Sequence, residues 1–274
     1  DLFTDVSCGG ATIDDFAGRQ GAFVNGEAAP QFDALNPTVD VVTIGIGGND
    51  VGFVSLALDC MRFTPQPLGE PPCTPEYKHG NVDKIEQRIT ATATELATAL
   101  DEVHRRAPNA AVLLIGYPTA LPDDAVACWP YLPILQEDMP YLVEKYKHMN
   151  AMLQNVAAAK GATYVDLYTP SIGHDACKPP GLAWINGGVL VPPSFPAHPN
   201  DLSYLNSAPI VSDAIRVALA KRSAAVPVTT TTAPAAVGGG ATGLLPRTGG
   251  DASAPLLLGA LAVAATALRR RRHA

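Results

Sequence analysis

Two side chains, an asparagine and a histidine, stand in the sequence where they could act together in acyl transfer. Asn49 follows the glycine-rich run "GIGG" at residues 45–48, and its amide, held by tight backbone, could donate a hydrogen bond to a developing oxyanion. One such donor contributes roughly 3–4 kcal/mol of transition-state stabilisation. His198 lies between Pro196 and Pro199, which restrict its backbone, and an imidazole is the commonest general base. A donor and a base together predict attack by a nucleophile on an acyl carbonyl.

The same residues fit other kinds of site less well. Gly45 and Gly47 begin the dinucleotide-binding pattern GxGxxG, but Asp50 occupies the place of the third glycine, and no phosphate-binding P-loop pattern occurs. The cysteines form no CxxC pair and no cysteine–histidine cluster with zinc-ligand spacing, so we expect neither a metal nor an organic cofactor. A lone histidine is often structural or surface-exposed, and His198 therefore needs a fold that brings it to Asn49.

The elements that must position these residues alternate between strands and helices. Apolar runs predict buried strands over residues 41–47, 110–117 and 163–167. Helical spacing of apolar residues predicts helices over residues 82–107, 140–160 and 201–222, the first with Asn81 as its N-cap and the second ended by Gly161. Such alternation predicts an α/β fold with a parallel sheet covered by helices on both faces. Ligands bind at the carboxyl ends of such strands, where Asn49 lies.

The distribution of charge excludes one class of partner. Residues 1–222 hold 14 of the 19 lysines and arginines and 25 of the 26 aspartates and glutamates, which gives this part a net charge of −11. The other five arginines follow it in the chain. An acidic body lacks the basic face that binding to nucleic acid requires, so we expect no nucleic-acid partner.

The five cysteines are typical of an exported protein with disulfides, because they are scattered through proline-rich, loop-like sequence. Local pairing of Cys60 with Cys73 and of Cys128 with Cys177 leaves Cys8 over. The chain begins with Asp1 and shows no signal peptide of the usual build. We therefore expect that an N-terminal segment with a further cysteine precedes it.

The C-terminal part has its own organisation. Residues 223–244 are rich in alanine, threonine, proline and glycine and predict an extended linker. Residues 245–274 contain "LPRTG", an apolar stretch at residues 254–268 and the tail "RRRRHA". A simple membrane anchor is one interpretation, although the stretch is short of the roughly 20 residues of a bilayer span. The ordered trio also resembles the cell-wall sorting signal of Gram-positive surface proteins. That resemblance implies cleavage by sortase between Thr248 and Gly249 and attachment to peptidoglycan, with residues 254–268 a transient membrane segment.

The first 222 residues resemble the SGNH (GDSL-type) hydrolases, and in particular their disulfide-bonded, secreted esterase and lipase branch from actinobacteria. The motifs that carry the resemblance occur in the order of that branch: "SCGGAT" at residues 7–12, "GIGGNDVGF" at 45–53, "SIGHDAC" at 171–177, "WINGG" at 184–188 and "HPN" at 198–200. The resemblance implies a flavodoxin-like three-layer α/β/α fold. It also implies a third disulfide, which would join Cys8 to a cysteine upstream of Asp1.

The resemblance assigns roles and shows two departures. Gly10 N–H and the Asn49 amide would form the oxyanion hole, and His198 would be the general base. The family's Gly-Asp-Ser block on its first strand does not occur in these 274 residues, nor does a GxSxG motif, so the nucleophile is expected upstream of Asp1. Phe195 stands where many members have an aspartate that orients the histidine. The backbone carbonyl of Phe195 or Pro196 would take over that task.

The sequence thus predicts an exported, wall-anchored serine ester hydrolase that acts on lipid or small acyl esters. This chain is expected to lack the first strand of the sheet, a central one, and with it activity and much stability. Two alternatives stay open. One is a non-catalytic surface binding protein on the same scaffold, and the other is a carbohydrate deacetylase.

Overall fold

A computed structural model of the chain describes residues 3–21, 26–64, 69–188 and 197–225. The chain separates into two units, Asp1–Val228 and Thr229–Ala274, and all described residues lie in the first. The predicted linker beyond residue 225, the LPRTG motif and the apolar segment at residues 254–268 lie outside the described residues. Among the residues that are described, no helix is long and apolar enough to cross a bilayer.

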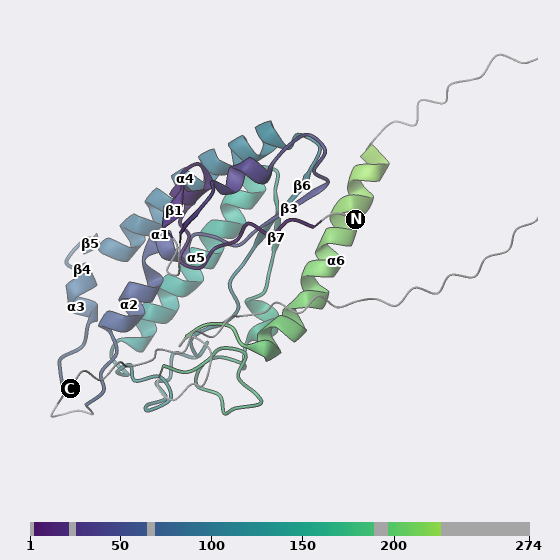
Figure 1. Cartoon of the computed structure of the whole chain (residues 1–274). Helices are drawn as coiled ribbons and strands as arrows, with labels where there is room; N and C mark the ends of the chain where they lie inside the picture. The colour runs from purple at the N-terminus through teal and green to yellow at the C-terminus, as the bar shows by residue number, and fades with distance from the viewer. Residues whose placement is uncertain (1–2, 22–25, 65–68, 189–196, 226–274) are drawn as a thin grey trace, which may run out of the picture. The chain divides into compact units, whose positions relative to one another are not determined.

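A parallel sheet of three strands forms the middle layer of the domain. Its strands are β3 (Val41–Ile44), β6 (Ala111–Ile115) and β7 (Thr163–Val165), in the order β3-β6-β7. The register pairs Thr43 with Leu113, and Leu113 with Thr163. Figure 1 shows the long helices α4 (Lys84–Arg106) and α5 (Met139–Ala159) together on one face, and α6 (Asp201–Ala225) on the other. The predicted three-layer α/β/α fold with a parallel sheet is confirmed.

Shorter elements connect these layers and mostly lie in the loops at the strand ends. They are the 3₁₀ helices η1 (Ile13–Phe16), η2 (Gln31–Ala34) and η3 (Thr169–Ser171), the helices α1 (Gly48–Val51), α2 (Phe53–Asp59) and α3 (Thr74–Tyr77), and the strand pairs β1 (Gln20–Gly21) with β2 (Glu27–Ala28) and β4 (Lys78–His79) with β5 (Val82–Asp83).

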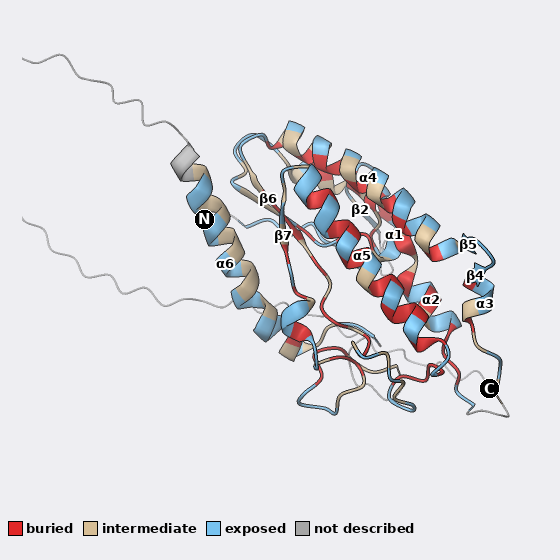
Figure 2. Cartoon of the chain, turned by 180° about the vertical axis from the view of Figure 1, so that it is seen from behind, coloured by how far each residue is buried: buried red, intermediate tan, exposed pale blue. Residues whose placement is uncertain are grey.

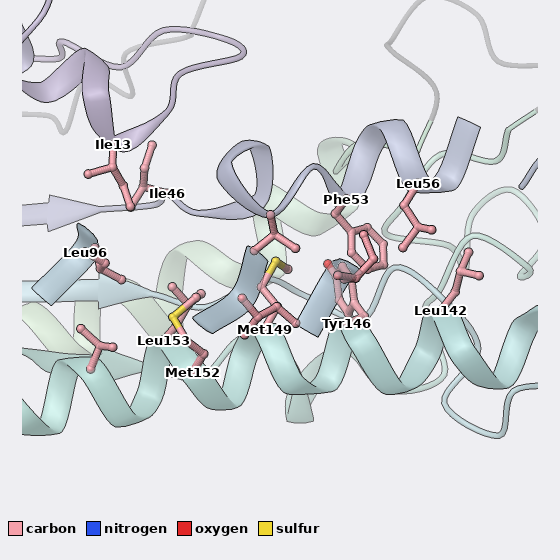
Figure 3. Packing of buried hydrophobic residues seen from close by; sticks show 14 of the residues in the cluster. Ile13, Ile46, Phe53, Leu56, Leu96, Leu142, Tyr146, Met149, Met152 and Leu153 are labelled. Atoms are coloured by element: carbon pink, nitrogen blue, oxygen red, sulfur yellow. The ribbon is translucent and has the colours of Figure 1, made fainter. Parts of the chain in front are cut away.

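The larger part of the core lies between the sheet and the pair α4 and α5, where Figure 2 shows the buried faces of both helices. Leu142, Met149 and Leu153 of α5 meet Leu96 of α4 and Ile46 in one cluster, as Figure 3 shows. The residues of α5 recur at helical spacing, so they share one face of the helix. A smaller cluster under α6 joins Leu113, Val165 and Leu167 to apolar residues of that helix, among them Ile210, Val211 and Ile215.

Two local predictions need correction. Residues 41–47 were predicted as a buried strand, but β3 ends at Ile44, and Thr43 is exposed. Within the described residues β3 pairs with β6 alone, so one of its edges faces no strand there, which explains the exposure. Asn81 was predicted as the N-cap of the first long helix. Asp83 caps α4 instead, because its carboxylate accepts a hydrogen bond from Glu86 N at 3.0 Å.

A buried ammonium group joins α5 to the start of α4. Lys145 is 2% exposed, and its Nζ lies 2.8 Å from Asp83 Oδ2, 2.8 Å from Glu86 Oε2 and 3.0 Å from Glu144 Oε1. Burial alone would raise the pKa of Asp83, but hydrogen bonds from Lys145, Glu86 N and Tyr141 outweigh it and hold that pKa below its ordinary value. The hydrogen bond from Lys145 likewise lowers the pKa of Glu86. Both carboxylates therefore stabilise the fold in their ionised form.

Replacing Lys145 with methionine is expected to lower the free energy of unfolding at pH 7 by about 1–3 kcal/mol. This loss is smaller than the loss from breaking a fully buried ion pair, because water can reach the carboxylates of Asp83 and Glu86. Since the two carboxylates have lowered pKa values in the fold, their contribution is present above their unfolded pKa values and is lost as the pH falls through the folded ones. Urea unfolding at pH 7 and pH 3 should therefore show a large difference between Lys145→Met and wild type only at pH 7. The exposed Lys84→Met is the control, and an equal loss at both pH values would contradict the account.

Candidate active site

Glycines at the carboxyl end of β3 let the chain turn directly into a short helix. Gly47 has a φ of +106°, a left-handed conformation that favours glycine, and it is the N-cap of α1. Gly48 N donates a hydrogen bond to the Tyr117 hydroxyl at 2.9 Å, and a Cβ at Gly48 would lie only 2.9 Å from the same oxygen. Burial raises the pKa of Tyr117, so the phenol stays protonated. The close approach explains the paired glycines and places Asn49 in the first turn of α1.

The structure brings Asn49 to the loop that carries Gly10. Asn49 Nδ2 donates a hydrogen bond to Ala11 O at 2.9 Å, and Ala11 N closes a turn on Cys8 O at 3.2 Å. Gly10 lies within that turn with a φ of +80°. The two residues predicted to bind an oxyanion, 39 positions apart in the sequence, therefore stand on adjoining backbone. Both are exposed, so a ligand can reach them.

Asp50 holds the same two segments together from the next position. Its Oδ1 accepts a hydrogen bond from Ile13 N at 2.9 Å, while its Oδ2 is buried and has no partner among the described residues. Burial raises the pKa of Asp50 despite the bond from Ile13, and the negative charges of Asp14 and Asp15 act in the same direction. The Asp50 carboxylate therefore holds the loop around Ile13 against the start of α1.

His198 lies on a segment whose backbone is clamped at both sides. Asn186 N donates to His198 O at 2.9 Å, Ala197 N donates to Asn186 O at 3.1 Å, and Ile185 forms an antiparallel bridge with Pro199. The His198 side chain is exposed. Figure 1 shows that α6, which begins just after this segment, starts at the end of the domain toward which β6 and β7 lead. His198 thus belongs to the loops at the carboxyl ends of the strands.

One residue of this region had no role assigned from the sequence. Asn200 Oδ1 accepts hydrogen bonds from Leu202 N at 3.0 Å and Ser203 N at 3.2 Å, and its Nδ2 donates to Ala183 O at 2.8 Å. Asn200 is therefore the N-cap of α6. Its bond to Ala183 O also holds the segment around residues 183–186, which contacts the backbone of His198. The signal was present, since an asparagine directly before a helix is a frequent cap.

This arrangement can be compared with known proteins. Residues 1–205 match the family described as GDSL-like Lipase/Acylhydrolase. The chain belongs to this family. Lipase 2 of Streptomyces coelicolor is 39% identical over 202 residues, which cover 73% of this chain and 66% of that protein. An esterase of Streptomyces scabiei is 30% identical over 232 residues, covering 73% of this chain and 67% of the relative. The match thus spans about two thirds of the length of these curated relatives.

Solved structures of lipases share the fold of this GDSL-type chain. An extracellular lipase from Streptomyces rimosus superposes with a TM-score of 0.56 at 26% identity, over 76% of this chain and 78% of that one. A phospholipase A1 from Streptomyces albidoflavus superposes with a TM-score of 0.55 at 19% identity over the same shares, which shows a common fold only.

The two predicted disulfides of this GDSL-type chain are confirmed. Cys60 bonds to Cys73 with a Cα–Cα distance of 5.1 Å, and Cys128 bonds to Cys177 with a Cα–Cα distance of 5.5 Å. Cys8 has no disulfide partner among the described residues.

The residues before Cys177 brace its loop. Cys177 N donates to Asp175 Oδ1 at 2.9 Å. The His174 ring stacks on Trp184 with centroids 4.5 Å apart, and its Nδ1 donates to Leu182 O at 2.7 Å.

The remaining predictions have mixed outcomes. Phe195, Pro196, Thr248 and Gly249 lie outside the described residues, so their predicted roles stay predictions. The part of the chain that is described contains no cluster of side chains suited to a metal ion. His79 and His148 are exposed, whereas His104 is half-buried and its Nε2 bonds to Lys160 O at 2.9 Å.

Proposed function

We propose that this protein is an exported serine ester hydrolase whose oxyanion hole is formed by the Asn49 amide and the Gly10 N–H. The observation that carries the proposal is the hydrogen bond from Asn49 Nδ2 to Ala11 O, because it fixes an amide donor beside a second backbone donor. One hydrogen of the Nδ2 group holds the loop, and the other is the one offered to substrate. Fixed donors of this kind stabilise the charge that develops on a tetrahedral intermediate.

The proposed reaction has two halves. A serine hydroxyl attacks the ester carbonyl, His198 accepts its proton, and the carbonyl oxygen gains negative charge between Asn49 and Gly10. The intermediate then breaks its C–O bond, and the alcohol leaves with the proton from His198. Water next attacks the acyl-serine, gives its proton to His198 and releases the carboxylic acid, after which the proton returns to the serine. A backbone carbonyl of Phe195 or Pro196 orients the imidazole, since the third group mainly fixes its tautomer and direction.

The attacking serine is proposed to lie upstream of Asp1. No Gly-Asp-Ser block occurs in the 274 residues, and the hydroxyl of Ser7, the serine nearest Gly10 in sequence, donates to Asp5 Oδ1 at 2.7 Å. The edge of β3 that faces no described strand supports the same idea, because a further strand would pair there and end beside Asn49. A cysteine of that segment is proposed to pair with Cys8.

We further propose that the enzyme works outside the cell, joined to peptidoglycan. Support comes from the two disulfides, which persist in oxidising compartments, and from the relative described as an extracellular lipase. The LPRTG motif, followed by the apolar stretch at residues 254–268 and the arginine-rich tail, supports cleavage by sortase between Thr248 and Gly249. Lipid or small acyl esters are the proposed substrates, in keeping with relatives named lipase and esterase.

Replacing Asn49 with alanine tests the proposal in protein expressed together with the upstream sequence of its gene. We expect kcat for a p-nitrophenyl ester to fall about 10²–10³-fold with KM little changed, because the lost donor acts mainly in the transition state. Asn81→Ala, an exposed change far from the site in sequence, is the control. The chain as printed should show no hydrolysis. Activity of that shorter chain, or an Asn49→Ala enzyme within threefold of wild type, would refute the proposed site.

A further inference from the structure

Three exposed aromatic side chains lie on the loops that carry the two disulfides. Phe63 is 66% exposed, Trp129 is 48% exposed and Tyr131 is 51% exposed. We call these three residues the aromatic rim. Single exposed apolar residues are ordinary in soluble proteins, but three large rings on neighbouring loops are a feature that indicates an interaction surface.

The rim is built on rigid backbone. Met61 forms an antiparallel bridge with Ile134, and Arg62 N donates to Pro133 O at 2.5 Å, so the loop before Phe63 is joined to the loop after Tyr131. Trp129 Nε1 donates to Arg62 O at 3.3 Å. The indole N–H is thus satisfied by the protein while about half of the side chain stays exposed.

Backbone hydrogen bonds also connect the rim to the histidine segment. Gly188 N donates to Tyr131 O at 2.9 Å. Two residues earlier, Asn186 N donates to His198 O at 2.9 Å. A surface that rests on the rim would therefore lie close to the loop that carries His198.

The chemistry of the rim fits an uncharged lipid surface. Trp and Tyr favour the boundary between water and lipid because one part of the ring system is apolar and the other polar. Leu58 on α2, the helix that leads into this loop, is a further exposed apolar side chain. The nearby Arg62 is buried, and its guanidinium donates to Pro71 O and Asp59 O, so it offers no cation to anionic headgroups. The acidic body would also be repelled by them.

We propose that the aromatic rim seats the protein on the surface of neutral lipid aggregates, from which ester groups reach the site of Asn49 and His198. The delivery of ester groups to the site rests on the proposed hydrolase function, but binding of the rim to lipid does not require catalysis.

The test measures contact between tryptophan and lipid in the full chain. Vesicles of bromine-labelled phosphatidylcholine quench only tryptophans that reach the lipid, and the chain contains two, the exposed Trp129 and the 8% exposed Trp184. We expect wild type to lose about a third or more of its emission, and Trp129→Phe to show almost no quenching. Phe63→Ser with Tyr131→Ser should weaken quenching about threefold or more, whereas Val217→Ser, an equally exposed apolar change on α6, should leave it unchanged.

The readout separates the rim from other causes of binding. The apolar stretch at residues 254–268 can itself bring the chain to vesicles, so sedimentation alone would not suffice. Co-sedimentation without quenching, or full quenching in Trp129→Phe, would overturn the inference. A shift of Trp129 emission on adding soluble oligosaccharides, with no response to lipid, would also overturn it in favour of a carbohydrate surface. Quenching without ester hydrolysis, in protein expressed together with the upstream sequence of its gene, would support the rim and count against the proposed enzyme.

Discussion

Replacing His198 with alanine is expected to lower kcat/KM for ester hydrolysis by about 10⁴-fold or more in protein that includes the proposed upstream serine. Without the imidazole nothing in the site accepts the serine proton as the tetrahedral intermediate forms. The clamp on its segment uses main-chain atoms of residues 197–200 and 184–186, and alanine keeps those atoms. The loss should therefore appear in kcat with little change in stability. Initial rates with a short-chain p-nitrophenyl ester and the thermal unfolding midpoint measure the two quantities.

A matched histidine distinguishes the general base from a merely exposed imidazole. His79 on β4 is exposed as His198 is, and His79→Ala should change kcat/KM by less than about twofold. A His198→Ala enzyme that keeps more than a tenth of wild-type activity would require a different base. If the upstream sequence supplies no serine and hydrolysis is absent throughout, a non-catalytic surface binding protein on the same scaffold becomes the better account.

The parts of the fold that sequence predicted best are those specified by local repeats. Helix α4 was expected over residues 82–107 because apolar residues recur at helical spacing, and Ile85, Ile89 and Leu96 are indeed buried along one face. Gly161, predicted to end the next helix, has a φ of +69° and follows Lys160, the C-cap of α5. Such features depend on a few neighbouring residues, so the pattern alone suffices.

The features that sequence could not supply depend on which distant segments meet. β3 is shorter and more exposed than its apolar run suggested, because among the described strands it has a partner on only one side. Asn81 and Asp83 are both good caps, and only the observed bond to Glu86 N decides between them. The juxtaposition of Asn49 with the Gly10 turn needed a family resemblance, since nothing in the spacing of 39 residues indicates a contact.

Removing the disulfide between Cys128 and Cys177 with a double alanine substitution is expected to lower the free energy of unfolding by about 4 kcal/mol. The bond closes a separation of 49 residues, and the cost arises because the unfolded chain gains the freedom that this cross-link denied it. The shorter separation of 13 residues between Cys60 and Cys73 should contribute about 3 kcal/mol by the same argument. Urea unfolding measures both, and loss of the longer cross-link should also raise the m-value, because the unfolded state becomes more expanded.

The longer disulfide should matter for catalysis as well as for stability. Cys177 closes the loop whose His174 stacks on Trp184, and Asn200 N, beyond His198, donates to Trp184 O at 2.9 Å. Loosening this loop therefore releases the segment that holds the proposed general base. We expect the Cys128→Ala/Cys177→Ala enzyme to lose activity at a temperature where its far-UV circular dichroism still reports folded helices. Activity and helix content that fall together would instead show that the disulfide stabilises the domain as a whole and does not hold His198 in place.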